Sequence, residues 1–323
     1  MEQTQDAIHV ILDNLLTVDE QIARLYECRL AHIREEATHA AAGYPKEEDV
    51  FFLRDAFRGD YAELMAHPRA AGGADTPLES QADLSRLCAR MRNAEAIYFC
   101  RTLLAHFRAS HGKRLQAEDF CPYEEPQDLE MHTERIAYLK NPHSDLAYRQ
   151  FCRILPQATV SYCDDFQQVC EAVSNGRARY GILPFASSAD GRLKPFRNLL
   201  NRFDLKIVLT CEVQGSDGNF TVFALFGRRI ITLDCGRYRA ASYFECSIST
   251  DAAQELPAIL EAAAYFGLRL QQMDTVMTVQ GAGASFDMVF AQDSADLCAF
   301  LCYLSLEHPR YLPLGVYTCL RKE

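Results

Sequence analysis

The stretch DDFQQVCEAVSNGRARYGILPFASSADG, residues 164–191, decides the fold class of this 323-residue chain. Its first part predicts a short helix that begins at an aspartate cap and stops at a glycine. The apolar run YGILPFA that follows predicts a buried strand. Two adjacent hydroxyls, Ser187 and Ser188, and an Asp-Gly turn come directly after that strand. The local pattern is therefore helix, strand and polar turn.

The sequence on both sides of this stretch repeats the alternation of helix and strand. One of the expected helices, residues 144–155, has Ser144 as its expected N-cap. Such alternation predicts a parallel sheet with helices on its faces, in which ligands bind at the carboxyl ends of the strands. Ser187 and Ser188 follow such a strand end. The expected strands are 135–140, 159–163, 180–186 and 205–213, and the expected helices are 144–155, 164–176 and 192–203.

The last third of the chain changes to a different order of elements. Two strand-like runs, 219–227 and 229–236, come first. From about residue 241 the pattern is strand, helix, strand, strand, helix, strand, which is the order of a ferredoxin-like βαββαβ unit. In this tail the expected strands are 242–249, 268–278, 285–291 and 311–319, and the expected helices are 253–267 and 294–308.

The first third of the chain is predicted to be helical. Apolar residues recur at close to helical spacing in residues 7–37, and residues 50–65 and 78–112 continue as helices. A glycine and a proline in AGYPKEED separate the first two of these helices. Three long helices cannot bury their apolar stripes alone, so we expect a bundle, which a second chain could complete.

Composition excludes several classes of function. The formal net charge of −11 argues against a broad nucleic-acid surface, although a few arginines suffice for a small anionic ligand. No apolar run reaches the roughly 18–20 residues that span a bilayer, and the N-terminus is unlike a signal peptide, so we expect a cytoplasmic protein. The 13 cysteines are scattered without a Cys-x-x-Cys motif. This pattern favours reduced, buried thiols and no metal site.

A helical N-terminus, an α/β middle and a βαββαβ tail, in this order, resemble the P-protein family of phenylalanine biosynthesis. That family fuses a chorismate mutase, a prephenate dehydratase and an ACT regulatory domain. The resemblance covers nearly the whole chain and is strongest from Arg135 to Val213 and in the tail. It implies a multidomain α and α/β fold. The implied parts are an all-α mutase-like domain over 1–112, a linker over 113–134, a shortened dehydratase-like parallel α/β domain over 135–238 and an ACT-like domain over 239–323.

The dehydratase-like part departs from the family at the strand end quoted above. There the family has Glu-Asn-Ser before its acidic-Gly turn. Here Ala186 replaces the Glu and Ser187 replaces the Asn, whereas Ser188 and the turn are retained. Ser144 holds the hydroxyl position of the family's first helix. The resemblance implies catalytic roles for Ser187 and Ser188 and substrate binding by Ser144.

A larger departure follows strand 205–213. In the family a second α/β lobe comes here, and the chain then returns through Thr-Arg-Phe, which supplies the main catalytic hydroxyl and an arginine for the substrate. The nearest counterparts are Gly218, Asn219 and Phe220, so most of that lobe, the hydroxyl and the cation are missing. The resemblance leaves Asn219 and Phe220 as substrate-binding candidates. Because dehydration of the prephenate dianion needs a closed cleft, an acid and fixed donors, we expect degraded catalytic motifs.

The mutase-like helices keep part of their family's pattern. That family holds the two carboxylates of chorismate with arginines and binds its ether oxygen with Lys and Gln. Asp19 and Arg29 match family positions, and Lys46 is the nearest substitute for the lysine, so Arg29 and Lys46 are the implied catalytic residues. The alternative is that such charges belong to solvated helix faces. The further candidates for binding the substrate are Arg90, Arg92 and Arg101.

The tail resembles an ACT domain, whose family binds phenylalanine at a dimer interface. The implied effector-binding residues are Gln254, Leu256, Gly267 and Asp274. Gln254 places a side chain where close backbone approach to the ligand is needed. The resemblance therefore implies the fold and a homodimer more directly than it implies an effector.

Two functions remain open from the sequence. The first is a divergent enzyme of L-phenylalanine biosynthesis, with chorismate mutase or prephenate dehydratase activity and no cofactor. The second is a non-catalytic homologue, a pseudoenzyme that binds an aromatic amino acid or a partner enzyme. In both, the expected ligand is a small anionic metabolite (chorismate, prephenate or phenylalanine), with no nucleic-acid or membrane partner. A serine hydrolase is disfavoured, because no Gly-x-Ser-x-Gly motif surrounds Ser187 or Ser188.

Overall fold

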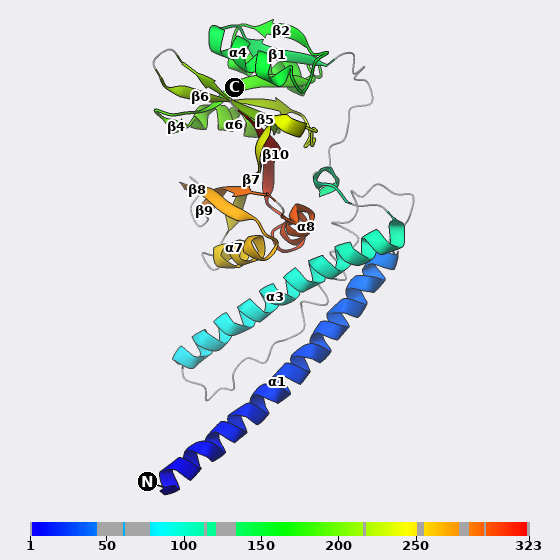
Figure 1. Ribbon diagram of the computed structural model, residues 1–323, viewed down its shortest axis with the longest axis vertical. Helices are drawn as coiled ribbons and strands as arrows, with labels where there is room; N and C mark the ends of the chain where they lie inside the picture. Colours follow the sequence, from blue (N-terminus) through cyan, green and yellow to red (C-terminus); the bar gives the residue numbers. More distant parts are fainter. Residues whose placement is uncertain are drawn as a thin grey trace. The chain divides into compact units, whose positions relative to one another are not determined.

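The computed structural model divides the chain into two compact units, Met1–Arg114 and Leu115–Glu323, which are drawn together in Figure 1. Lys46, Gln254 and most of the expected helix 50–65 and linker 113–134 lie outside the described residues. The described residues are 2–43, 61, 78–112, 115–120, 134–215, 218–250, 255–277, 284–293 and 295–321.

The first unit contains two long helices, α1 (Glu2–Gly43) and α3 (Leu78–His111), as the sequence predicts. They lie side by side and run in the same direction, because Arg29 pairs with Glu95 and Arg34 with Tyr98 further along both helices. Their apolar stripes follow the helical period and meet between them. The buried apolar residues of the stripes are Ile33, Ala37, Ala41, Ala96, Ile97, Phe99, Cys100, Leu103 and Phe107.

The second unit is built on one ten-stranded sheet in the order β2-β1-β3-β6-β5-β10-β7-β9-β8, with β4 paired to β3. The strands of its first half are β1 (Arg135–Leu139), β2 (Thr159–Cys163), β3 (Tyr180–Ser187), β4 (Gly191–Arg192), β5 (Lys206–Gln214) and β6 (Phe220–Gly227). Those of its second half are β7 (Arg239–Thr250), β8 (Arg269–Met277), β9 (Ala284–Ala291) and β10 (Leu312–Leu320).

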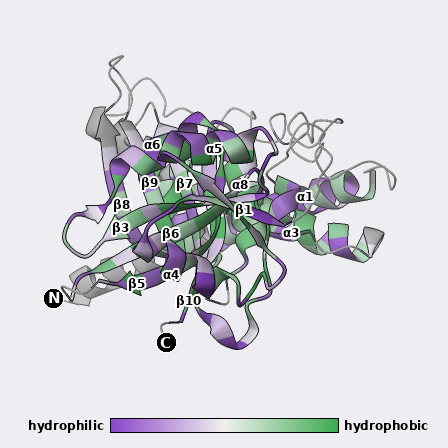
Figure 2. Ribbon diagram, turned by 90° about the horizontal axis from the view of Figure 1, so that it is seen from above, coloured by the Kyte–Doolittle hydropathy of each residue, from purple (hydrophilic) through white to green (hydrophobic). Residues whose placement is uncertain are grey.

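Helices cover both faces of this sheet. α4 packs its Ala147 and Phe151 on one face, whereas α5 and α6 pack Val169 and Leu200 on the other. Figure 2 shows the consequence, with hydrophobic residues along strands such as β6 and hydrophilic turns on α6. The helices are α4 (Pro142–Phe151), α5 (Phe166–Ser174), α6 (Lys194–Arg202), α7 (Glu255–Tyr265) and α8 (Leu297–Glu307), with short 3₁₀ helices η2 (Ala117–Phe120) and η3 (Gly236–Tyr238).

The four strands expected to form a parallel sheet, β1, β2, β3 and β5, all run in the same direction, but the sheet as a whole is mixed. β1, β2 and β3 are parallel to one another, but β6 is inserted antiparallel between β3 and β5. The reason is the short connection 215–219, since strands joined by so few residues can pair only in the antiparallel sense. The parallel order resumes at β5, which pairs with β10.

The expected strand 229–236 is wrong, because the structure has an irregular segment there. Ile230 and Cys235 are buried, so the apolar run reflects burial rather than pairing. The backbone N–H of Thr232, which a strand would use in its ladder, donates to Glu118 Oε1 at 2.7 Å. The Glu118 side chain therefore accepts the hydrogen bond that a neighbouring strand would otherwise accept.

The second half of the unit has the expected βαββαβ order, with its strands arranged β10-β7-β9-β8. α8 covers one face, where Phe300 contacts Phe244 and Phe290, and the opposite face is directed toward α6. Because β10 pairs with β5 as well as with β7, one sheet contains strands from both sides of residue 239, which is the expected start of the ACT-like domain.

The helix caps agree only in part with expectation. Asp165 caps α5, accepting from the Gln168 N–H at 2.7 Å, as predicted. Ser144 does not cap α4: Asn141 does, and its Oδ1 accepts from the Ser144 N–H at 2.8 Å. Pro142, whose ring fixes φ at a helical value, begins the helix two residues before Ser144.

Candidate functional site

Ser187 and Ser188 lie at the carboxyl end of β3, as the sequence predicts. With Asp190, Asn219 and Phe220 they form what we call the rim. Ser187 Oγ donates to Asp190 Oδ2 at 3.0 Å and accepts from the Asp190 N–H at 2.9 Å. These two bonds close the turn between β3 and β4, so the Ser187 hydroxyl has a structural role in the turn.

Ser188 is brought together with both residues expected from the far side of the site. Its Oγ donates to Asn219 Oδ1 at 3.2 Å and accepts from the Phe220 N–H at 3.1 Å. Its own N–H donates to Phe220 O at 2.9 Å, which extends the pairing of β3 with β6. The rim is therefore one connected structure, built from residues more than thirty positions apart.

The rim supplies hydroxyl and amide groups but few groups for acid–base chemistry. Ala186 offers only a methyl group, and Asp190 is exposed and accepts from Ser187. Neither hydroxyl caps α6, because that helix begins after Leu193 with no side-chain cap bond. The arrangement suits hydrogen bonding to a small polar ligand better than proton transfer to a leaving group.

Ser144 follows β1, whose carboxyl end lies at the same sheet edge as that of β3. Ser144 is only 1% exposed. A ligand in contact with the rim would therefore not meet the Ser144 side chain without a rearrangement of α4. The structure places this residue in the core beside the site.

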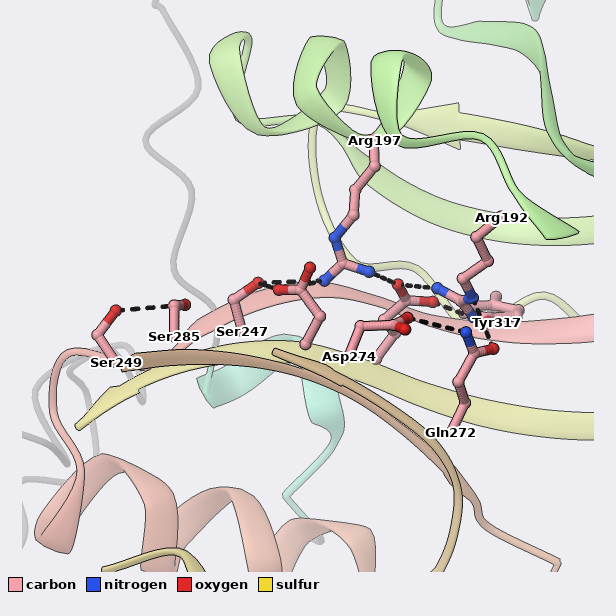
Figure 3. A network of polar contacts seen from close by, with 10 residues as sticks. Arg192, Arg197, Ser247, Ser249, Gln272, Asp274, Ser285 and Tyr317 are labelled. Atoms are coloured by element: carbon pink, nitrogen blue, oxygen red, sulfur yellow. Dashed lines mark hydrogen bonds and ion pairs between the residues drawn. The ribbon is translucent and has the colours of Figure 1, made fainter. Parts of the chain in front are cut away.

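Figure 3 shows a cluster of charges that sequence reasoning missed, and its Arg192 lies opposite Ala186 in the pairing of β3 with β4. Arg192 of β4 and Arg197 of α6 both form ion pairs with Glu245 of β7, which is fully buried. Tyr317 OH donates to Glu245 Oε2 at 3.0 Å. One signal was available: Glu245 is a lone charge in the apolar run SYFECSIS.

Arg197 extends the cluster across the sheet. Its Nη2 donates to Ser247 Oγ at 3.1 Å and lies 3.0 Å from Asp287 Oδ1. Ser247 Oγ donates to the same Asp287 oxygen at 2.5 Å. We call Arg192, Arg197, Glu245, Asp287 and Tyr317 the charge cluster.

Burial and charge shift the pKa values within this cluster. Burial raises the pKa of Tyr317 well above its ordinary value, and the negative charge of Glu245 adds to the effect. Burial alone would lower the pKa of Arg192, but Glu245 and Tyr317 outweigh it and raise that pKa. Tyr317 therefore stays a neutral donor and Arg192 stays a cation at ordinary pH.

In the helical unit, Arg29 is already paired. It forms a two-pronged ion pair with Glu95, with Nη2 to Oε2 at 2.9 Å, and Glu95 is 1% exposed. Its hydrogen bond to Glu95 raises the pKa of Arg29. Arg29 therefore faces a carboxylate of the chain itself, where a mutase would present it to its substrate.

The three expected arginines of α3 do not gather on one face. At about 100° per residue, Arg92 lies about 160° around the helix from Arg90, whereas Arg90 and Arg101 share a face. Eleven residues separate that second pair, which is about 16 Å along the axis. All three residues are exposed. No single small ligand contacts all three on this helix.

The expected effector residues are spread over the second half of the sheet unit. Gly267 has φ +83° in the turn between α7 and β8, a conformation that favours glycine. Leu256 is in the first turn of α7, one helix length away. Asp274 accepts from Gln272 Nε2 at 2.8 Å on the face toward Arg192, away from α7. The structure does not bring these three residues together.

The residues that the structure describes include no group of three His, Cys, Asp or Glu residues able to hold a metal ion. No helix among them is long and apolar enough to cross a membrane. The described cysteines are free thiols; Cys28 is exposed, contrary to expectation, whereas burial raises the pKa of Cys170 to about 12.

Comparison with known proteins finds a family match over the first half of the sheet, from the end of β1 to the end of β5. Residues 139–214 match the family model described as prephenate dehydratase. No curated protein matches the chain. The prephenate dehydratase structure from Streptococcus mutans is 18% identical, covers 58% of this chain and 100% of its own, and has a TM-score of 0.49.

Two further solved structures are similar at lower TM-scores. One, titled a novel type of quorum quenching acylase, GqqA, is 26% identical, covers 57% of this chain and 95% of its own, and has a TM-score of 0.43. The other, a prephenate dehydratase from Arthrobacter aurescens in complex with L-Phe, is 14% identical, covers 57% and 89%, and has a TM-score of 0.43. By its family match, residues 139–214 form a prephenate dehydratase-like segment in a mixed α/β unit.

Proposed function

We propose that this chain is a divergent relative of the P-protein that binds a small anionic metabolite of aromatic amino-acid metabolism without dehydrating it. In this proposal residues 1–112 derive from a chorismate mutase, 135–238 from one lobe of a prephenate dehydratase and 239–323 from an ACT domain, with 113–134 as a linker. The match of residues 139–214 to the dehydratase family supports the middle assignment.

The state of the rim carries the proposal. Loss of a hydroxyl from prephenate requires an acid aimed at that oxygen in a site closed to water. Here the Ser187 hydroxyl is bonded to Asp190, the Ser188 hydroxyl is bonded to Asn219, and Ala186 has no acidic group. What the rim retains is hydrogen bonding, which suffices to bind a ligand.

The connection between β5 and β6 supports the same conclusion. Residues 215–219 alone join the two strands, so no second lobe is inserted at this point of the chain. One lobe leaves a bound ligand open to water, which weakens the electrostatic interactions that a transition state needs.

We expect calorimetry of the whole chain to detect binding of prephenate or L-phenylalanine, and incubation with prephenate to produce no phenylpyruvate above the uncatalysed rate. Ser188→Ala should weaken binding about two- to ten-fold, because one neutral hydrogen bond contributes about 0.5–1.5 kcal/mol. Ser161→Ala, on β2, is the matched control. Turnover of prephenate would overturn the non-catalytic assignment, and absence of binding by both ligands would overturn the ligand class.

A second candidate, chorismate mutase activity in the helical unit, is favoured by one observation. Asn93, Glu95 and Thr102 are polar yet buried in α3. Such an interior is unusual for a helix pair and is the kind of environment that electrostatic catalysis uses. Because Glu95 neutralises Arg29, we expect chorismate, added in the same assays, to yield no prephenate. Measurable prephenate formation would favour this candidate instead.

We also propose a homodimer that forms through β8, an edge strand of the sheet. Three large apolar side chains are exposed on α7 and β8: Tyr265 at 52%, Leu270 at 38% and Met273 at 40%. The pairing of Leu270 with Phe290 and of Met273 with Met288 places both on the face of the sheet that carries α7 and α8. A group of exposed apolar residues on an unpaired edge is typical of an interface.

The Leu270→Glu/Met273→Glu double variant should elute as a monomer in size-exclusion chromatography with light scattering, whereas the wild-type chain elutes as a dimer. Two charges at each edge would have to be buried without partners, which opposes association. Leu312→Glu, at an exposed apolar residue on another strand, is the control and should remain dimeric. A monomeric wild-type chain would contradict the proposal.

A further inference from the structure

Arg192 stands beside the rim on the short strand β4. The pairing of β3 with β4 sets Arg192 directly opposite Ala186 and Gly191 opposite Ser187. Ser188 follows directly after β3, and its N–H donates to Phe220 O at 2.9 Å, two residues beyond the Ala186 that faces Arg192. The cation of Arg192 and the hydroxyl of Ser188 thus belong to the same β3–β4 hairpin.

The contacts that hold Arg192 are partly open to solvent. Its guanidinium is paired with buried Glu245, its Nε donates to Gln272 Oε1 at 3.0 Å, and it lies 4.8 Å from the centre of the Phe185 ring. The Arg192 side chain is 18% exposed, and Gln272 is on the surface. Of the two arginines on Glu245, Arg192 is the more accessible, since the Arg197 side chain is 9% exposed.

Glu245 does not depend on Arg192 alone. Arg197 and Tyr317 also bind its carboxylate. Arg197 is further anchored by Ser247 and Asp287 and is therefore the fixed partner (Figure 3). A buried carboxylate that lost its only cation would be strongly destabilised, but here a second cation stays in place when the first turns away.

We propose that Arg192 binds the carboxylate of the rim's ligand, and that Glu245 and Gln272 hold its guanidinium until that ligand arrives. The inference deepens the proposed function and rests on it. The ligand class is a small organic acid with a carboxylate for Arg192 and a polar group within reach of Ser188. Arg192 exchanges one carboxylate for another, and Arg197 keeps Glu245 paired in both states.

The proposal gives opposite signs to two substitutions at the same ion pair. Arg192→Gln removes the ligand's cation and should weaken binding. Glu245→Gln removes the competing negative charge with little change in shape, leaves Arg192 free for the ligand and should strengthen binding. If Arg192 only braced the β3–β4 turn, both variants would loosen the rim and weaken binding together.

Calorimetry with prephenate, and in parallel with L-phenylalanine, tests this on the whole chain. We expect Arg192→Gln to raise Kd about ten- to hundred-fold, in the range of one charged hydrogen-bonded contact, and Glu245→Gln to lower it several-fold. Gln272→Ala removes an exposed partner of Arg192 without touching the core and should also lower Kd. Arg269→Gln, which breaks an exposed ion pair with Asp293, is the control and should leave Kd unchanged.

The outcomes separate the two proposals. If the wild-type chain binds neither probe, the proposed function fails and the role of Arg192 fails with it. If the wild-type chain binds and Arg192→Gln binds equally well, or if Glu245→Gln and Gln272→Ala both weaken binding, Arg192 is structural and only the present inference is overturned. Should Glu245→Gln fail to fold, as judged by circular dichroism, Gln272→Ala decides.

Discussion

Gly315→Ala is expected to lower the unfolding free energy of the 115–323 unit by about 3 kcal/mol, an overpacking cost at the upper end of the usual range. An alanine Cβ at this position would lie 2.4 Å from Ile207 O and 2.9 Å from Ile207 N. Both atoms are backbone atoms of β5, so neither can move aside without loosening the β5–β10 pairing. That pairing joins the two halves of the sheet.

Thermal unfolding followed by circular dichroism or calorimetry measures this effect. A loss of about 3 kcal/mol corresponds to a fall in Tm of about 6–12 °C for a unit of this size. Gly227→Ala is the matched control, because its Cβ would meet Arg179 O and the Tyr180 ring at 3.4 Å, which the structure accommodates with little adjustment. An equal fall in Tm for the two variants would show that the close approach of β5 to β10 at Gly315 does not cause the loss of stability.

Arg197→Leu is expected to cost about 3 kcal/mol, because it removes one of the two cations that neutralise a nearly buried set of carboxylates. Asp287, whose side chain is 15% exposed, loses its ion pair, and Glu245 keeps the more accessible Arg192 and the hydrogen bond from Tyr317. Removing one member of such a set leaves an uncompensated charge in the protein. The loss should appear as a lower midpoint in urea with an unchanged m-value.

A double variant makes the origin of that cost testable. Arg197→Leu/Asp287→Leu removes both charges of the pair and should recover much of the stability that Arg197→Leu loses, since an apolar pair can replace a buried ion pair at little cost. Arg202→Leu, an exposed arginine in the last turn of the same helix, is the control and should change stability by less than about 0.5 kcal/mol. Additive losses in the double variant would contradict an electrostatic origin.

Local chemistry made most elements of this chain predictable. Asp165 caps α5 and Gly176 follows its end with φ +70°, so that helix could be bounded from a few adjacent residues. The βαββαβ order of the tail followed from hydrophobic period alone. The N-cap of α4 was misassigned because Asn141 and Ser144 are both good caps, and only the position of Pro142 distinguishes them.

Long-range contacts decided what local pattern could not. Residues 229–236 are as apolar as a strand, but the Thr232 N–H is bound by Glu118, over a hundred positions earlier. The convergence of Arg192 and Arg197 on Glu245 likewise joins segments about fifty residues apart. In the sequence alone, Arg192 and Arg197 look like solvated surface charges. Their partner Glu245 lies on β7, which is distant in the sequence.

The sequence by itself determined most of the helices and strands, their order and the hydroxyl turn after β3, because each depends on residues within about one turn or one strand of itself. Only the tertiary structure decided that β6 inserts antiparallel, that β10 joins β5 into one sheet, and that the arginine beside the rim is held by a buried glutamate. Those features depend on which distant backbone and side-chain groups satisfy one another after burial, and no short stretch of sequence contains both partners.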